Sequence, residues 1–110
     1  MTASKVPSQI QVYRKAGGYR VRPATYATGR GTSVTFFNAG PARIVRLLFP
    51  EVIFEGVGAG PVDIPAGESV TLTAANVEPG VYPYAAYYFD PTGEKDFAAG
   101  ESGPVIIIDR

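Results

Sequence analysis

Residues 31–38 read GTSVTFFN, and the apolar side chains of Val34 and Phe36 lie two positions apart within this stretch. A period of two is typical of a β-strand with one buried face, because successive side chains of a strand point to opposite sides of its sheet. Residues 38–41 read NAGP, and glycine and proline favour turns. The stretch therefore predicts a short, half-buried strand that ends at a turn.

Similar strand signals occur on both sides of this stretch. Further strands are expected at residues 8–15, 19–28, 43–49, 51–57, 68–74, 81–88 and 104–109. Pro23 lies inside one of them, and proline within a strand pattern indicates an edge, a bend or a crossover between sheets. Residues 94–99 fit a single helical turn. Roughly seven to nine short strands without a long amphipathic helix predict an all-β fold, an antiparallel two-sheet Greek-key sandwich.

The composition agrees with one small folded domain. The chain has 110 residues, of which 45% are hydrophobic and 18% are charged, so it does not resemble a disordered chain. Its 13 glycines and 10 prolines suit many short elements joined by turns. We expect a flexible N-terminal segment at residues 1–7 and a single domain at residues 8–110.

The chain contains neither cysteine nor histidine. A disulfide, a thiolate or imidazole metal site, a cysteine nucleophile and a histidine general base are therefore excluded. No familiar pairing of nucleophile and base is visible among the other residue types. The sequence predicts a protein that is not an enzyme and that uses no cofactor.

The N-terminal residues give two possible compartments. Residues 1–7 lack the hydrophobic core of a signal peptide, and no stretch approaches the roughly 20 apolar residues that span a bilayer. We therefore expect no membrane span. The protein is cytoplasmic if Met1 is the native start, and periplasmic or secreted if the chain is a mature domain with an added methionine.

Charge is divided unevenly along the chain. Residues 1–50 contain eight basic and no acidic residues, whereas residues 51–110 contain ten acidic and two basic residues. Two interpretations remain open. Strands from the two halves lie side by side and their charges interleave, or a basic and an acidic surface form and attract a partner.

Four motifs, taken in order, resemble the cupredoxins, a family of small copper proteins. Residues 31–38 are similar to the G-[DT]-x-V-x-[FW]-x-N strand of that family, and residues 64–69 (IPAGES) resemble the turn before a covering strand. Residues 78–84 (EPGVYPY) are similar to the run that leads into the copper-binding loop, and residues 103–108 (GPVIII) to the closing strand. The resemblance extends over roughly residues 8–109 and implies a sandwich of cupredoxin-like topology.

Cupredoxin copper is held by two histidines, one cysteine and a distant methionine. The resemblance places Arg43, Ala86, Phe89 and Glu101 at these four positions, so all the copper ligands are missing. The resemblance therefore implies a metal-free relative without electron transfer. Arg43 and Glu101 are expected to approach each other at this end, either as an ion pair or as separate loop charges.

Tyr87, Tyr88 and Phe89 form an aromatic cluster where the copper loop of the family opens to solvent. If exposed, they mark a binding surface, and the alternative is that they pack beneath the loop at residues 90–103. Together with the divided charge, they predict a non-catalytic binding or assembly module that acts through protein–protein contacts. Its partner is another protein or a second copy of the chain.

Single-stranded nucleic acid is an alternative partner. Tyr13, Tyr19 and Tyr26 lie among basic residues that include Arg20 and Arg22, and rings beside cations suit single strands. The pI of about 6.2 is low for such proteins, so the sequence disfavours this partner.

A hard cation such as calcium is the other alternative. Asp90, Glu94 and Asp96 place three carboxylates in one loop, and calcium takes oxygen ligands. Their spacing differs from that of an EF-hand, and Lys95 lies between two of them. A solvated turn is the favoured interpretation of this loop.

Overall fold

A computed structural model describes residues 9–15, 18–49, 52–57, 61–75, 77–89, 95–97 and 104–109, with only the backbone described for residues 95–97. The expected flexible segment at residues 1–7 lies outside these ranges. Every regular element within them is a β-strand, which confirms the all-β class. The strands are β1 (Gln9–Lys15), β2 (Gly18–Arg22), β3 (Thr25–Gly29), β4 (Ser33–Asn38), β5 (Ile44–Leu48), β6 (Val62–Pro65), β7 (Ser69–Thr73), β8 (Gly80–Pro83), β9 (Ala85–Phe89), β10 (Lys95–Phe97) and β11 (Val105–Asp109).

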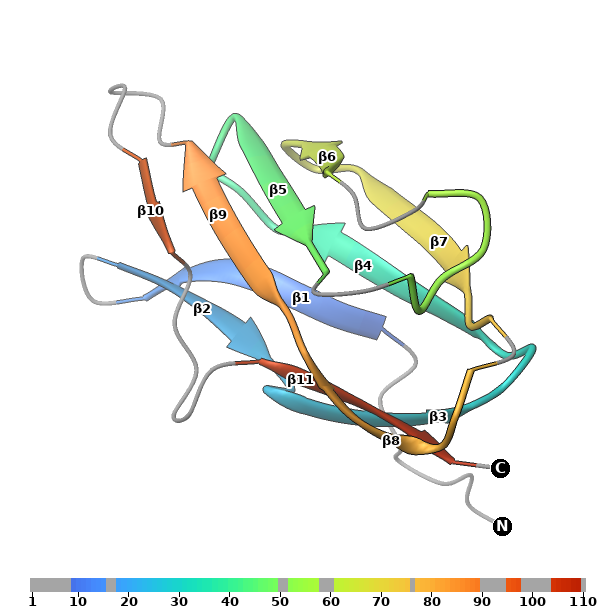
Figure 1. Ribbon diagram of the computed structural model, residues 1–110. Coiled ribbons are helices and arrows are strands. Elements are labelled where there is room, and N and C mark those ends of the chain that lie inside the picture. The colour runs from blue at the N-terminus through green and yellow to red at the C-terminus, as the bar shows by residue number, and fades with distance from the viewer. Residues whose placement is uncertain are drawn as a thin grey trace, which may run out of the picture.

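The strands form the two layers of a sandwich. The first sheet has the order β2-β1-β4-β7, and the second layer contains the groups β3-β11-β8 and β10-β9-β5-β6. Only Tyr84 separates β8 from β9, and its amide donates a hydrogen bond to the carbonyl of Pro104 at 3.1 Å. The chain thus joins the two groups of the second layer. In Figure 1, β9 passes in front of β1, which belongs to the other layer.

Pro23 marks a crossover between the layers, which is one of the three possibilities that the sequence left open for it. It lies between β2, in the first sheet, and β3, in the second layer. Two strand pairs, β1 with β4 and β3 with β11, are parallel, and the other pairs are antiparallel. The expectation of a purely antiparallel sandwich was wrong in this detail, because strands that pair after a crossover can run in the same direction.

Two other expected elements also differ. Residues 52–57 do not form the expected strand and make only a single bridge, between Phe54 and Ala74. Ile53 and Phe54 are buried, but they lie in a loop. The short β6 follows instead, and it tolerates its terminal proline as an edge strand. Residues 95–97 form β10, paired with β9, rather than part of a helical turn.

The core between the layers centres on Phe36, whose side chain is fully buried. Its ring lies edge-on to those of Phe54 and Tyr84, with centroid distances of 5.9 and 5.8 Å. Phe49 completes the cluster at 6.3 Å from Phe36. Aromatic rings favour such edge-to-face geometry. The inward positions expected in residues 31–38 are confirmed, because Val34 and Phe36 are buried.

Replacing Phe36 with alanine tests this alternation. Phe36→Ala is expected to lower the free energy of unfolding by about 3–5 kcal/mol, because it removes the central ring of the core. Phe37→Ala is the matched control, since Phe37 is the next residue and lies half-buried on the outer face. Urea denaturation measures both, and equal losses would contradict the assigned strand faces.

Candidate functional site

The structure brings together two of the four positions that the sequence resemblance assigned to copper ligands. The backbone amide of Arg43 donates a hydrogen bond to the carbonyl of Phe89 at 2.8 Å, just before β5 and at the end of β9. Ala86 lies farther along β9, opposite Leu47, and is buried. Glu101 lies outside the described residues, so its approach to the exposed Arg43 stays a prediction.

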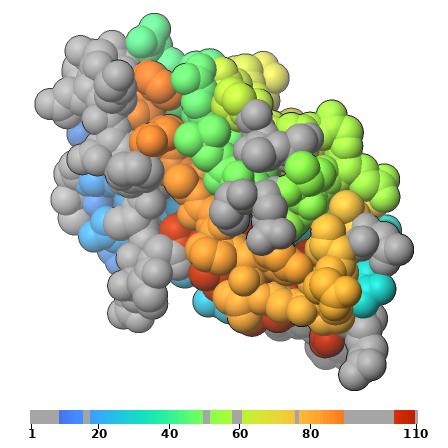
Figure 2. All heavy atoms as spheres, viewed as in Figure 1, coloured from blue at the N-terminus to red at the C-terminus, as the bar shows by residue number. Residues whose placement is uncertain are grey.

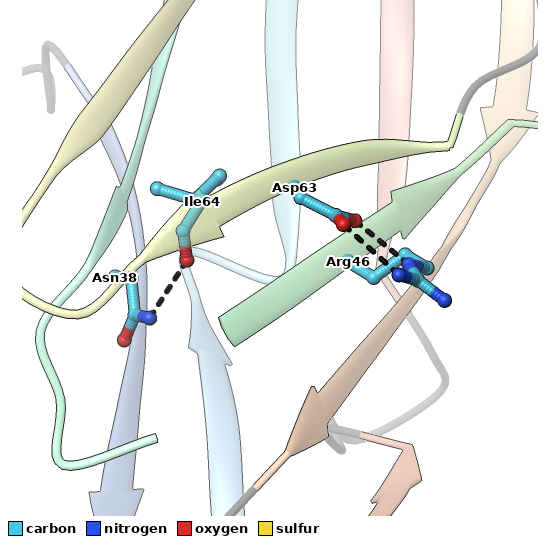
Figure 3. A network of polar contacts seen from close by, with 4 residues as sticks. All are labelled: Asn38, Arg46, Asp63 and Ile64. Carbon is cyan, nitrogen blue, oxygen red and sulfur yellow. Dashed lines mark hydrogen bonds and ion pairs between the residues drawn. The ribbon is translucent and has the colours of Figure 1, made fainter. Parts of the chain in front are cut away.

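The loop that carries Arg43 is held by Asn38, whose side chain is fully buried. The Asn38 side-chain nitrogen donates hydrogen bonds to the carbonyls of Ala42 at 3.1 Å and Ile64 at 2.9 Å. Its side-chain oxygen accepts a hydrogen bond from the Gly40 amide at 2.8 Å. Figure 3 shows the contact between Asn38 on β4 and Ile64 on β6. The sequence pointed to Asn38 only as the last residue of the strand motif and gave no sign of these partners.

The aromatic cluster of β9 is divided between the two sides of the second layer. Tyr88 packs against the core, where its ring lies 4.1 Å from that of Tyr19 between centroids. Tyr87 and Phe89 occupy the alternate positions and are half-buried on the outer side. The structure thus places Tyr88 against the core, while Tyr87 and Phe89 stay candidates for binding. Packing of these rings beneath the loop at residues 90–103 stays a prediction, because most of that loop lies outside the described residues.

Apolar side chains continue from Tyr87 and Phe89 across the outer side of the second layer. Phe89 lies opposite Ile44, and Ala85 lies opposite Leu48, in the register of β9 with β5. We call these residues the apolar face: Ile44, Leu48, Ala85, Tyr87 and Phe89. Atoms of β5, β8 and β9, drawn in green and orange, reach the surface in Figure 2.

A shallow hollow of about 340 Å³ borders the apolar face. Its lining in the described part of the chain consists of Leu48, Phe49, Pro83, Tyr84 and Ala85. Burial raises the pKa of the Tyr84 hydroxyl, which therefore stays protonated at neutral pH. The hollow thus offers apolar surface and no charged group among these residues.

An ion pair between Arg46 of β5 and Asp63 of β6 lies beside the apolar face. The Arg46 guanidinium donates two hydrogen bonds to the Asp63 carboxylate, at 2.7 and 2.9 Å (Figure 3). The same guanidinium lies over the ring of Phe89, 5.1 Å from its centroid. The hydrogen bond from Arg46 holds the pKa of the Asp63 carboxyl below its usual value of 3.8. The pair fixes a cation beside an aromatic ring.

The outer side of the first sheet has a different chemistry. Exposed basic residues gather on the outer side of the hairpin of β1 and β2, and we call them the basic edge: Lys15, Arg20 and Arg22. Arg14 is also exposed, but it alternates to the inner side of β1, opposite the buried Tyr19. The Arg22 guanidinium lies 4.9 Å from the ring centroid of Tyr13. Tyr19 is buried and Tyr26 packs against the core, so only Tyr13 of the three expected tyrosines accompanies these cations.

The expected cation loop is mostly outside the described residues. Asp90 and Glu94 fall there, and of Asp96 only the backbone is described, in β10 opposite Tyr88. Within the described residues no group of three or more acidic side chains could hold a metal ion. These residues also form no helix long and apolar enough to cross a membrane.

No family model matches the chain, and no curated protein matches it. Solved structures do match. Two reduced amicyanin mutants superpose with TM-scores of 0.60 and 0.61 at 12% and 13% identity, over 98% and 97% of this chain and 86% of each amicyanin chain. A purple cupredoxin from Nitrosopumilus maritimus superposes with a TM-score of 0.51 at 19% identity, over 94% of this chain and 100% of its own. The chain therefore has a cupredoxin-like fold, and it lacks the copper ligands.

Removing the Asn38 amide tests its role at this end of the fold. Asn38→Ala is expected to lower the free energy of unfolding by about 2–4 kcal/mol, because it leaves buried carbonyls without their donor. Thr71→Ala serves as the control, since it breaks an exposed hydroxyl contact with Thr35 at 2.9 Å. Urea denaturation compares the two, and similar small losses would contradict a structural role for Asn38.

The ion pair of Arg46 and Asp63 predicts a pH-dependent coupling. The pKa of the Asp63 carboxyl is lower in the folded protein than in the unfolded chain. The ion pair therefore stabilises the fold fully at pH values above the unfolded pKa. This stabilisation is lost as the pH falls through the folded pKa. A double-mutant cycle with Arg46→Gln and Asp63→Asn, measured by urea denaturation, should show coupling at neutral pH and none in strong acid. Coupling that persists in strong acid would refute this.

Proposed function

We propose that this chain is a non-catalytic, metal-free binding module that contacts a protein partner through the apolar face. The observation that carries the proposal is the contrast between the two outer surfaces of the sandwich. The first sheet presents serine, threonine and glutamine beside its basic edge, whereas β5 and β9 present apolar side chains on both sides of Arg46.

The apolar face has the composition of an interface core. Such cores are enriched in aromatic residues and arginine, and a few of these side chains contribute most of the binding energy. Tyr87 and Phe89 are the aromatic residues here, and Arg46 is held in place by Asp63. A side chain that is already ordered loses less conformational entropy when a partner binds.

The surface extends beyond the apolar face along β8. Val81 is 62% exposed, and it lies opposite Ile107 of β11. Together with the hollow beside Leu48, it enlarges the area that a partner could cover. Large exposed apolar patches on a folded protein often mark sites of contact with another protein.

The residue types support a non-catalytic role. The sequence lacks histidine and cysteine, and the carboxylate beside the apolar face, Asp63, is engaged with Arg46. A side chain held in an ion pair is poorly suited to act as a general base, because its pKa is lowered. We therefore assign binding rather than chemistry to this surface.

Replacing the aromatic residues tests the proposal. The immobilised parent protein should retain a partner from cell extract. The double variant Tyr87→Ser/Phe89→Ser should not retain that partner, because it lacks both rings of the apolar face. After identification and purification of that partner, calorimetry should show at least about tenfold weaker binding. Sedimentation of the chain alone shows whether a second copy is the partner.

The matched control lies on the opposite surface. Phe37→Ser removes a half-buried ring from the outer face of the first sheet and should leave partner binding unchanged. Circular dichroism checks that each variant is folded. Retention that depends on Phe37 and not on Tyr87 and Phe89 would overturn the proposal.

A further inference from the structure

We propose that the outer face of the first sheet binds single-stranded nucleic acid. This face lies on the opposite side of the sandwich from the apolar face, so the proposal is independent of the protein contact proposed above. It depends on three features of β1, β2 and β4: clustered exposed cations, half-buried rings on the same face, and the absence of acidic residues from this sheet.

The cations are brought together by strand pairing. In the register of β1 with β2, Arg20 lies opposite Tyr13 and Arg22 lies opposite Gln11. Both arginines are exposed on the outer face, and Lys15 is exposed on the same face at the end of β1. Clustered lysine and arginine side chains on one surface are the electrostatic signature of phosphate-backbone binding.

The rings lie among these cations. Tyr13 and Phe37 are half-buried on the outer face, and Phe37 lies opposite Gln11 in the parallel pair of β1 and β4. Bases of a single strand stack on aromatic side chains, and a sheet face presents such rings side by side. The amide of Gln11 and the hydroxyl of Thr35 add groups that can both donate to and accept from base edges.

The first sheet contains no acidic residue. None of its four strands, β1, β2, β4 and β7, contains aspartate or glutamate. The cations of the basic edge therefore have no carboxylate neighbour within their own sheet. The near-neutral pI averages these cations with acidic residues that lie elsewhere in the chain, so it does not describe this surface.

Nucleic acid fits this surface better than an acidic protein does. An acidic peptide would pair with the arginines and leave the rings of Tyr13 and Phe37 without a specific partner. A single strand uses both, because it combines negative phosphates with flat bases. A duplex would contact the cations while its paired bases remain stacked away from the rings.

Fluorescence anisotropy with a labelled single-stranded oligothymidylate tests the proposal on the full chain. If the basic edge contacts about three phosphates, binding should weaken about 20-fold as salt rises from about 50 to about 200 mM. Arg20→Glu should weaken binding by about tenfold at low salt. The matched control is Arg43→Glu, an exposed arginine outside the first sheet, which should change binding less than about twofold.

A second variant separates base stacking from charge. Tyr13→Leu keeps an apolar side chain but removes the ring, and it should weaken binding to oligothymidylate while leaving binding to inorganic polyphosphate unchanged. Circular dichroism confirms that each variant is folded. Equal loss with Arg20→Glu and Arg43→Glu would show that only overall charge matters, and this would overturn the proposal.

Three other results would also overturn it. No binding at low salt would mean that the surface takes no nucleic acid. Competition by polyglutamate as strong as that by unlabelled oligonucleotide would identify an acidic protein as the partner. The third result is that polyphosphate binds as tightly as the oligonucleotide and that Tyr13→Leu weakens neither. It would indicate a site that binds anions without contacting bases.

Discussion

The end of the sandwich where a copper ion would sit in related folds depends on a buried amide. Asn38 satisfies its side chain within the protein, and its backbone also pairs with Glu68 and Gly67. A buried polar group that lost these partners would carry a desolvation cost, so the surrounding loop has one favourable arrangement. That arrangement sets the path of the chain into β5, where the amide of Arg43 meets the carbonyl of Phe89. Hydrogen bonds from Asn38 thus connect the described segments at this end of the fold.

Strand alternation then decides what each layer presents to solvent. On β9 it turns Tyr88 toward Tyr19 and leaves Tyr87 and Phe89 on the outer side. On β4 it buries Phe36 and leaves Phe37 on the other outer side. Because both sheets use their inner faces for one shared core, the two outer faces are free to differ in chemistry. One is apolar with a fixed arginine, and the other is polar and basic.

The sequence predicted the features that depend on local pattern and missed those that depend on long-range pairing. Residues 31–38 form the expected strand because their alternation is regular and turns flank them. Residues 52–57 were misassigned because a short apolar run suits a buried loop as well as a strand. The parallel pairs follow from crossovers that no local signal specifies. The inward position of Tyr88 was accessible from sequence, since the period of two that buries Tyr82 and Tyr84 also reaches it.

The divided charge shows why topology is needed to interpret composition. Interleaving of the two halves requires that basic strands lie beside acidic ones. The neighbours of β1 are β2 and β4, and neither contains an acidic residue, so interleaving does not occur within the first sheet. By contrast, β5 pairs with β6 and brings Arg46 to Asp63, which is interleaving of the expected kind. The same overall charge division therefore gives a neutralised pair on one side of the sandwich and a cluster of like charges on the other.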